Sequence, residues 1–319
     1  MKRVAVLCVG IIVLAFVPAV VSAQGLLPGL PAFGGIFGGR ASCGEPVAPG
    51  LGPLVFYVGW MPDNRNVGFG AGGAPLGGIF QLDQDYDSKG LWLGIQESGM
   101  LSDWLGVMAT GWYLFPSNSS SIEVYNNGVL GTRSWDTSTQ WWFVDGAFLI
   151  GGPCGLSAIV GLRFDYFNTQ FTNSNPFNTF GLGLLGDGAT VNSQGWIPLL
   201  GTQYAYASSA TNLTVRVVGF PTLLGNVKYT ETIGGLGAVG SAQFSGTYNG
   251  GYFLEVFSEY SRMFGPGGVG VFARWNMTHG TSNSDLSLDG LGSNGFDLGV
   301  NRTSWTLGGS FNLSFNTPL

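Results

Sequence analysis

Apolar and polar residues alternate along the stretch from Arg302 to Phe315. Starting at Thr303, every second residue is mainly apolar or aromatic, and the residues between them are small or polar. Successive side chains of a β-strand point to opposite faces, so this period of two predicts a strand with one apolar and one polar face. At about fourteen residues, it would be longer than the five or six residues usual in globular proteins.

The same alternation recurs along most of the chain. Further strands are predicted at 54–61, 88–97, 103–115, 134–150, 155–168, 211–220, from Val227 onward, 250–263 and 268–279. This makes about ten strands, and because 190–210 could hold another, eight or twelve remain open. The connections are short at "SGMLSD", "GGPCG", "PTLLG" and "FGPGG" and long and rich in Ser, Asn, Gly and Thr elsewhere. Alternating short and long connections are typical of short periplasmic turns and long extracellular loops.

Composition bears on which face of these strands meets water. Only 9% of the residues are charged and 14% are aromatic, whereas a typical soluble domain is about 25% charged. Alternation alone also fits a soluble secreted β-sandwich, but so few charges cannot cover a water-facing surface. A net charge of −6 with 12 Lys and Arg residues supplies no basic face, so no nucleic-acid partner is expected.

The first residues have the pattern of an export signal. Lys2 and Arg3 precede an apolar core, and small residues stand before Gln24, so cleavage is predicted after Ala23. We therefore expect a signal peptide at 1–23, a Gly/Pro-rich periplasmic arm at 24–52 and a barrel domain at 53–319. No later run of about 18 apolar residues predicts a transmembrane helix.

The export signal, the alternating segments and the final strand with its aromatic Phe315 resemble the bacterial outer-membrane β-barrel proteins. The resemblance implies an all-β fold: a transmembrane antiparallel up-and-down β-barrel in the cell outer membrane. It also implies outer-membrane lipids and the outer-membrane assembly machinery as partners. The assembly machinery often reads a terminal aromatic, although here "NTPL" follows Phe315. No motif identifies a subfamily, and nothing in the sequence sets the oligomeric state.

In such a barrel the apolar face points to lipid, with aromatic residues concentrated at the two interfaces. The residues predicted to form this lipid-facing aromatic girdle are Tyr113, Trp135, Trp142, Phe164, Tyr166, Trp275, Trp305, Phe311 and Phe315. The polar face would then line the lumen.

Charged residues lie on that second face in most strands. The predicted lumen charges are Asp145, Arg163, Asp165, Arg216, Glu255, Glu259, Arg274 and Arg302. A barrel of about ten strands is narrow, and an unpaired buried charge is costly, so these four arginines and four carboxylates are expected to pair. Bulky Trp104, Trp112, Phe253 and Phe257 are expected to point inward too. Either the lumen is plugged by this network, or it is wider and the charges line a small wet pore.

Two cysteines follow the signal peptide. Cys43 lies in the arm and Cys154 in a predicted periplasmic turn, so both would be in the same oxidising compartment. A disulfide between them is predicted, and the alternative is two free thiols too far apart to bridge. Two cysteines and one histidine do not predict a metal site, and no cofactor is expected.

Three functions fit this reading. The first is a narrow porin-like channel for ions or small solutes, and the second is a non-conducting structural or adhesive barrel that displays Ser/Asn/Gly-rich loops. The third, an outer-membrane enzyme, would rest on His279, which has Ser282 and Asp285 close by in sequence. Sequence proximity does not supply the geometry of a catalytic triad, so we expect a polar rim histidine and no catalytic residue.

Overall fold

The computed structural model of the 319-residue chain describes part of its length. The described residues are 43, 50–62, 67–73, 80–86, 89–115, 118–126, 130–152, 154–173, 188–208, 210–235, 238–265, 267–288 and 291–313. The predicted signal peptide, most of the predicted arm, the side chain of Trp135 and all of Phe315 lie outside these residues. The predictions made for them stay predictions.

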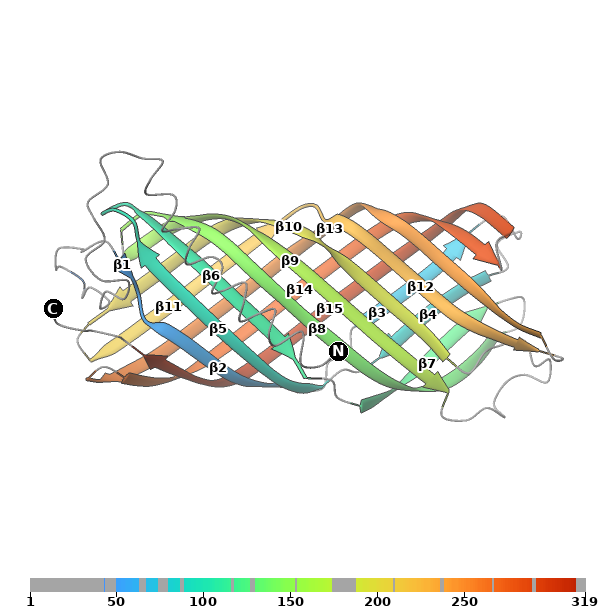
Figure 1. Ribbon diagram of the computed structural model, residues 1–319, viewed down its shortest axis with the longest axis horizontal. Helices are drawn as coiled ribbons and strands as arrows, with labels where there is room; N and C mark the ends of the chain where they lie inside the picture. Colours follow the sequence, from blue (N-terminus) through green and yellow to red (C-terminus); the bar gives the residue numbers. More distant parts are fainter. Residues whose placement is uncertain are drawn as a thin grey trace.

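The secondary structure of the described residues consists of β-strands (Figure 1). They are β1 (Gly50–Leu51), β2 (Leu54–Met61), β3 (Val67–Gly73), β4 (Phe80–Tyr86), β5 (Gly90–Met100), β6 (Leu105–Leu114), β7 (Asn118–Asn126), β8 (Leu130–Ile150), β9 (Gly155–Asn173), β10 (Gly188–Ala207), β11 (Thr211–Phe220), β12 (Leu224–Gly235), β13 (Ala238–Phe264), β14 (Gly267–Leu288) and β15 (Leu291–Leu313). Within these ranges, no helix is long and apolar enough to cross a membrane.

These segments join into a closed barrel of ten antiparallel strands. β2 and β3 form one barrel strand because both pair with β15. Likewise, β6 and β7 both pair with β8, and β11 and β12 both pair with β10. β4 and β5 form one barrel strand that lies between the β2–β3 strand and the β6–β7 strand. The pairing of β15 with β2 and β3 closes the barrel. The predicted fold class is therefore confirmed.

Two of the predicted strands are placed differently. The stretch left open at 190–210 is a strand, β10, and the segments at 211–220 and from Val227 belong to one barrel strand, β11 followed by β12. β10 pairs with both through Leu200↔Gly219 and Trp196↔Leu224, which leaves one extra residue on the β11–β12 side. This is a bulge around Pro221, which has no N–H for the ladder. The predicted turn "PTLLG" is this bulge.

The two ends of the barrel differ. Short turns near Asp103, Gly152, Ser208 and Gly265 lie at one end, which is on the left in Figure 1. At the other end, stretches predicted as loops continue as paired strands, such as β7 with β8. β13 has 27 residues, which at about 3.3 Å per residue and a tilt of about 40° reach roughly 65–70 Å along the axis. A bilayer's hydrocarbon core is about 30 Å thick, so the hairpins extend far beyond one membrane face.

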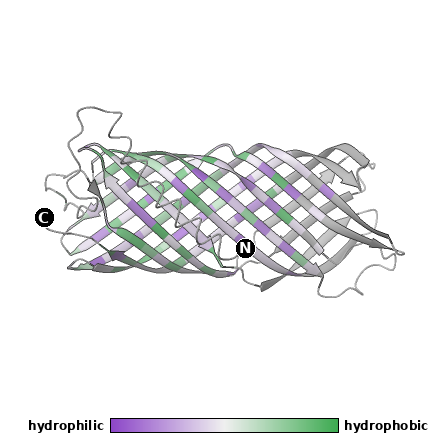
Figure 2. Ribbon diagram, in the orientation of Figure 1, coloured by the Kyte–Doolittle hydropathy of each residue, from purple (hydrophilic) through white to green (hydrophobic). Residues whose placement is uncertain are grey.

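Burial alternates along the strands in the sense expected for a lipid-embedded barrel. Outward-facing Val58 and Trp305 are 53% and 55% exposed, whereas inward-facing Arg274 and Thr306 are fully buried. Figure 2 shows apolar residues gathered on the half of the wall nearer the short turns. A soluble sandwich would bury the apolar face instead, so the wall is suited to lipid.

Position along the wall should decide what an outward charge costs. Replacing Leu162, outward on β9 between the two barrel ends, with Arg should lower the free energy of unfolding by about 2–4 kcal/mol, because the charge would face the bilayer interior. Gln170→Arg, on the same face of the same strand but eight residues further towards the hairpins, should cost at most about 1 kcal/mol. Urea titration in phospholipid vesicles measures both losses. Equal losses would contradict the inference that Leu162 faces the bilayer interior and Gln170 lies outside it.

Candidate functional site

The charged residues of the lumen centre on Arg163 (β9). Arg163 Nε donates to Asp145 Oδ1 at 2.6 Å, and Nη2 donates to Asp145 Oδ2 at 2.7 Å. The two residues are direct partners across β8 and β9, which allows this two-pronged contact. Arg163 Nη2 also reaches Glu255 Oε2 on β13 at 2.9 Å. All three side chains are at most 2% exposed, so the pairs are sheltered from water.

Glu255, on a third strand, links this pair to Arg216 on a fourth. Arg216 Nη2 (β11) donates to Glu255 Oε1 at 3.4 Å. Arg216 Nη1 donates to Gln96 Oε1 (β5) at 3.2 Å and to Met108 Sδ (β6) at 2.8 Å. Strands β5, β6, β8, β9, β11 and β13 are thus connected by side chains through the lumen. The contacts of Arg163 with Glu255 and of Arg216 with Gln96 cross the lumen, because they join strands that are not neighbours in the ladder.

A second ion pair lies nearer the hairpins. Arg302 Nη2 (β15) donates to Asp165 Oδ2 (β9) at 2.6 Å, and Trp141 Nε1 donates to Asp165 Oδ1 at 2.8 Å. The Arg302 guanidinium also lies 5.0 Å from the Trp141 ring centroid and 4.9 Å from that of Phe167. Here the cation is held by a carboxylate and two aromatic rings together.

The expected pairing fails for Arg274 and Glu259, which form no ion pair within the described part of the chain. Arg274 Cζ instead lies 4.5 Å from the ring centroids of both Trp92 and Trp112. Glu259 accepts hydrogen bonds from neutral donors: Tyr57 at 2.9 Å, Ser310 at 2.7 Å and Asn312 at 3.4 Å. Arg274 therefore lies against the faces of aromatic rings, although pairing with a carboxylate was expected.

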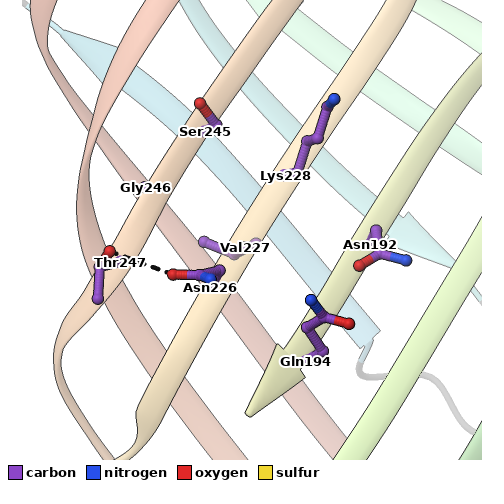
Figure 3. Close-up of a pocket in the computed structure, with 8 residues that line it drawn as sticks. All are labelled: Asn192, Gln194, Asn226, Val227, Lys228, Ser245, Gly246 and Thr247. Atoms are coloured by element: carbon purple, nitrogen blue, oxygen red, sulfur yellow. Dashed lines mark hydrogen bonds between the residues drawn. The ribbon is translucent and has the colours of Figure 1, made fainter.

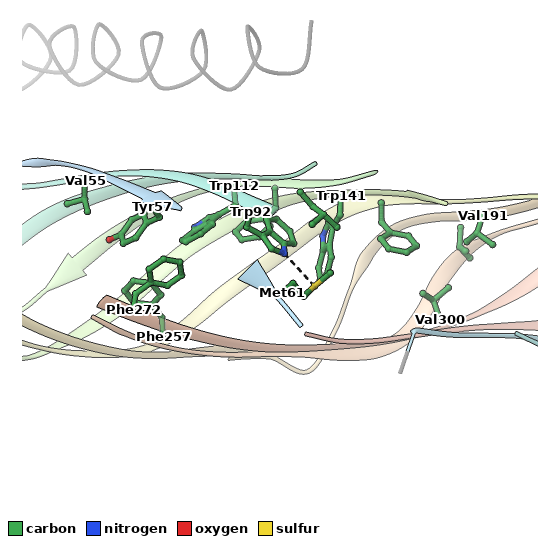
Figure 4. Close-up of a cluster of buried hydrophobic side chains, with 14 of the residues drawn as sticks. Val55, Tyr57, Met61, Trp92, Trp112, Trp141, Val191, Phe257, Phe272 and Val300 are labelled. Carbon is green, nitrogen blue, oxygen red and sulfur yellow. Dashed lines mark hydrogen bonds between the residues drawn. The ribbon is translucent and has the colours of Figure 1, made fainter. Parts of the chain in front are cut away.

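Large aromatic side chains fill the space between the charges (Figure 4). Tyr57 stacks on Trp112 with centroids 5.0 Å apart, and Trp92 packs edge-on against Trp141 at 5.2 Å. Gly94 makes room for the Trp112 ring, since a Cβ there would lie 2.6 Å from it. Of the bulky residues expected inward, Trp112, Phe253 and Phe257 are buried. The expectation for Trp104 is wrong, because it lies in a short turn and is 61% exposed.

All ten barrel strands contribute to this filling. Each of the ten barrel strands contributes an inward side chain that is at most 3% exposed. These side chains are Tyr57, Trp92, Trp112, Phe143, Arg163, Ile197, Arg216, Phe257, Arg274 and Thr306. We call this layer the lumen plug. Sequence reasoning missed Tyr57 and Trp92 because their short segments alternate less cleanly than the later strands.

The two cysteines are joined. Cys43 and Cys154 form a disulfide with their Cα atoms 5.6 Å apart. Cys43 N also donates to Ala207 O at 2.8 Å, at the end of β10. The arm is therefore fixed to the short-turn end of the barrel, on the β8–β9 turn and beside β10.

Most of the predicted girdle residues that the structure describes face outward. Phe164 and Tyr166 both lie 5.4 Å from the Trp142 ring, Phe164 packs on Trp196 at 5.0 Å, and Trp275 lies 6.1 Å from Trp305. Phe311, nearer the short turns, is 46% exposed. Other aromatic residues also face outward, and they include Trp60, Trp196, Tyr204, Tyr206, Tyr252 and Tyr260.

Tyr113 is the exception among these girdle residues. It lies directly opposite Trp142 across β6 and β8, but only 6% of it is exposed. Its ring packs against Phe115 with centroids 5.1 Å apart. The expectation that it meets lipid directly is therefore wrong.

Beyond this belt the outer wall becomes polar. A shallow groove of about 610 Å³ lies over β10, β12 and β13 (Figure 3). It is lined by Asn192, Gln194, Asn226, Val227, Lys228, Ser245, Gly246 and Thr247. Asn192 Nδ2 donates to the hydroxyl of the girdle residue Tyr166 at 3.3 Å. The change from aromatic to amide and lysine side chains marks where the wall leaves a bilayer.

His279 lies on the outer face of β14, between Tyr252 on β13 and Asn301 on β15. Its ring is 5.2 Å from that of Tyr252, and its Nδ1 is hydrogen-bonded to Asn301 Oδ1. Ser282 is 1% exposed, and the side chain of Asp285 lies outside the described residues. Within the described ranges, no three His, Cys, Asp or Glu side chains are grouped so that they could hold a metal ion.

No protein-family model and no curated protein matches the chain. Its structure is similar to that of the outer membrane protease OmpT from Escherichia coli, with a TM-score of 0.61 at 13% identity, over 86% of this chain and 100% of that one. A second structure, the outer membrane protein OprG from Pseudomonas aeruginosa, has a TM-score of 0.37 at 12% identity, over 84% of this chain and 98% of that one. The first comparison gives this chain the fold of a bacterial outer-membrane β-barrel.

The central ion pair should behave as a coupled unit. Asp145→Asn and Arg163→Gln should each lower the free energy of unfolding by about 3–5 kcal/mol, because each leaves a buried charge without its partner. The double variant should cost less than the two single losses added, by about 1–3 kcal/mol. Urea unfolding in detergent measures the free energy of unfolding of the wild type, the two single variants and the double variant. Arg262→Gln, which removes an exposed arginine, is the control, and strict additivity would refute the coupling.

The disulfide should contribute stability through the 111 residues that separate its cysteines. Cys154→Ser should lower the free energy of unfolding by about 2–4 kcal/mol, because the unfolded chain regains the freedom of that loop. Cys43→Ser should cost the same, and the double variant no more than either single change. A double variant that is clearly less stable than both would show that the two cysteines act separately.

Proposed function

We propose that the protein is an integral outer-membrane β-barrel that conducts no steady ion current and acts through the hairpins projecting beyond the outer leaflet. Outer-membrane lipids and the outer-membrane assembly machinery are the partners that this placement requires. The closed barrel, the outward aromatic belt and the similarity to an outer membrane protein support the location. The observation that carries the function is the lumen plug.

A porin-like channel needs a wall that water can reach from one end to the other. Within the plug, Arg163, Phe143 and Arg274 are at most 2% exposed, and each of the ten barrel strands contributes a buried inward side chain. A path for ions would have to part Arg163 from Asp145 and Glu255, which costs several kcal/mol per broken buried pair. This favours the non-conducting barrel over the narrow channel.

The hairpins are the remaining surface on which a partner could act. β13, β14 and β15 have 27, 22 and 23 residues and stay paired over most of their length. Paired hairpins present a fixed surface, since their backbone groups are already bonded. We propose that this surface is displayed to the exterior for structural or adhesive contact.

The experiment is single-channel recording of detergent-purified protein in a planar bilayer, with heat-modifiable gel migration to verify that the barrel is folded. Wild-type protein should give no steady current steps. The triple variant Trp92→Ala, Trp112→Ala and Phe143→Ala, which removes three rings of the plug, should give them if it remains folded. Steady steps from the wild type would overturn the proposal in favour of the channel.

A second assay addresses the enzymatic alternative, because one of the similar structures is that of a protease. Folded protein is incubated with an unfolded polypeptide, and His279→Ala is the matched variant. We expect no cleavage by either protein. Cleavage by the wild type that is lost in the variant would replace the structural role with an enzymatic one.

A further inference from the structure

Four polar residues form a compact block on the inner wall of β14 and β15. Arg274 lies directly opposite Thr306, and Asn276 lies directly opposite Ser304. Each of the four is fully buried, at 0% exposure. They belong to the level of the lumen plug, and we call them the β14–β15 polar block.

Hydrogen-bond donors are in excess in this block. Ser304 Oγ donates to Asn276 Oδ1 at 2.9 Å. Arg274 Nε, Nη1 and Nη2, together with Asn276 Nδ2 and Thr306 Oγ1, have no hydrogen-bond partner among the described residues. Guanidinium and amide nitrogens can only donate. These nitrogens therefore lack an acceptor, and the Thr306 hydroxyl can donate to the same acceptor.

The nearby aromatic rings do not supply one. Arg274 Cζ lies 4.5 Å from the centroids of Trp92 and Trp112 and 4.8 Å from that of Phe143. Ring faces attract the cation as a whole, but they do not offer lone pairs to its five N–H groups. The indole nitrogen of Trp112 is itself buried without a partner among the described residues, which adds one more donor beside Arg274.

Of the four lumen arginines, Arg274 is the one with no carboxylate in contact among the described residues. Arg163, Arg216 and Arg274 share this level with two carboxylates, and both carboxylates are engaged: Asp145 by Arg163, and Glu255 by Arg163 and Arg216. Asp165 is held by Arg302, and Glu259 by Tyr57, Ser310 and Asn312. One positive charge, that of Arg274, is left without a counter-charge in contact.

We propose that the β14–β15 polar block binds one small monovalent anion, of the halide class, that becomes enclosed as the barrel folds. The anion accepts hydrogen bonds from Arg274, with Asn276 and Thr306 as the neighbouring donors. A single negative charge matches the one guanidinium that has no carboxylate in contact, and the three surrounding rings leave room only for a small ion. A water molecule could accept the same hydrogen bonds, but it would leave Arg274 without a counter-charge in contact.

Refolding in different salts tests this directly. The full chain is unfolded in urea and refolded into detergent micelles with sodium chloride, sodium bromide or sodium gluconate at equal ionic strength. Gluconate serves as an anion too large for the block. Chloride and bromide should raise the midpoint of thermal unfolding by at least about 5 °C relative to gluconate, and the rise should saturate with concentration. After desalting and denaturation, ion chromatography should recover one bromide per barrel.

Two variants separate the site from a general salt effect. Thr306→Asp places a carboxylate directly opposite Arg274, so it should abolish both the bromide recovery and the difference between salts. Arg262→Gln, which removes an exposed arginine, should keep both. Arg274→Gln should also lose both, and the aspartate variant keeps the test decisive if the glutamine variant fails to fold.

The contrary results are equally definite. Equal midpoints in chloride and gluconate with no retained bromide would overturn the proposal and leave water as the acceptor. A salt effect of the same size in Thr306→Asp would overturn it too, because a halide could not then be the partner of Arg274.

Discussion

Inside a bilayer a backbone N–H or C=O group finds no water to bond, so a chain that crosses as strands must bond every one of them to a neighbouring strand. The closure of β15 onto β2 and β3 meets this requirement, because it leaves no open sheet edge. Closure also fixes what each side chain can do. With lipid outside, the polar residues of every strand are directed into an interior that ten strands make narrow.

That narrow interior explains why charged and aromatic side chains are packed together there. Buried charges need partners, and these come either from the neighbouring strand, as Asp145 does for Arg163, or from across the lumen, as Glu255 does. Aromatic rings fill the volume between them and lie against the guanidinium groups of Arg274 and Arg302. The same residues thus exclude water and hold cations, so the filling of the barrel and its electrostatics cannot be changed independently.

The sequence predicted the features that depend on alternation along a single strand. Alternation at 302–315 and 155–168 predicted β15 and β9 and the face that each turns to lipid, because side-chain direction has the same period as the strand. β10 was left open because Gly195 and Pro198 interrupt its pattern. The bulge at Pro221 was taken for a turn because proline favours both.

The part of the site that could not be predicted depends on contacts across the lumen. Which carboxylate an inward arginine reaches depends on the strand facing it, and no local pattern encodes that relation. Counting four charges of each sign predicted full pairing, whereas Arg274 lies among rings and Glu259 among neutral donors. The two cysteines were a simpler case, because only one pairing was possible after the signal peptide.

The bond between Cys43 and Cys154 has a consequence for how the barrel is assembled. The chain between these cysteines contains β2 to β8, which are the first four of the ten barrel strands. Once oxidised, these strands form a single covalent ring fastened at the short-turn end, with the hairpin tips at the opposite end left free. The proposed orientation keeps the fastened end in the periplasm, where disulfides form. The tips can then cross the membrane while the ring stays closed, and a bond at the other end of the barrel could form only after that crossing.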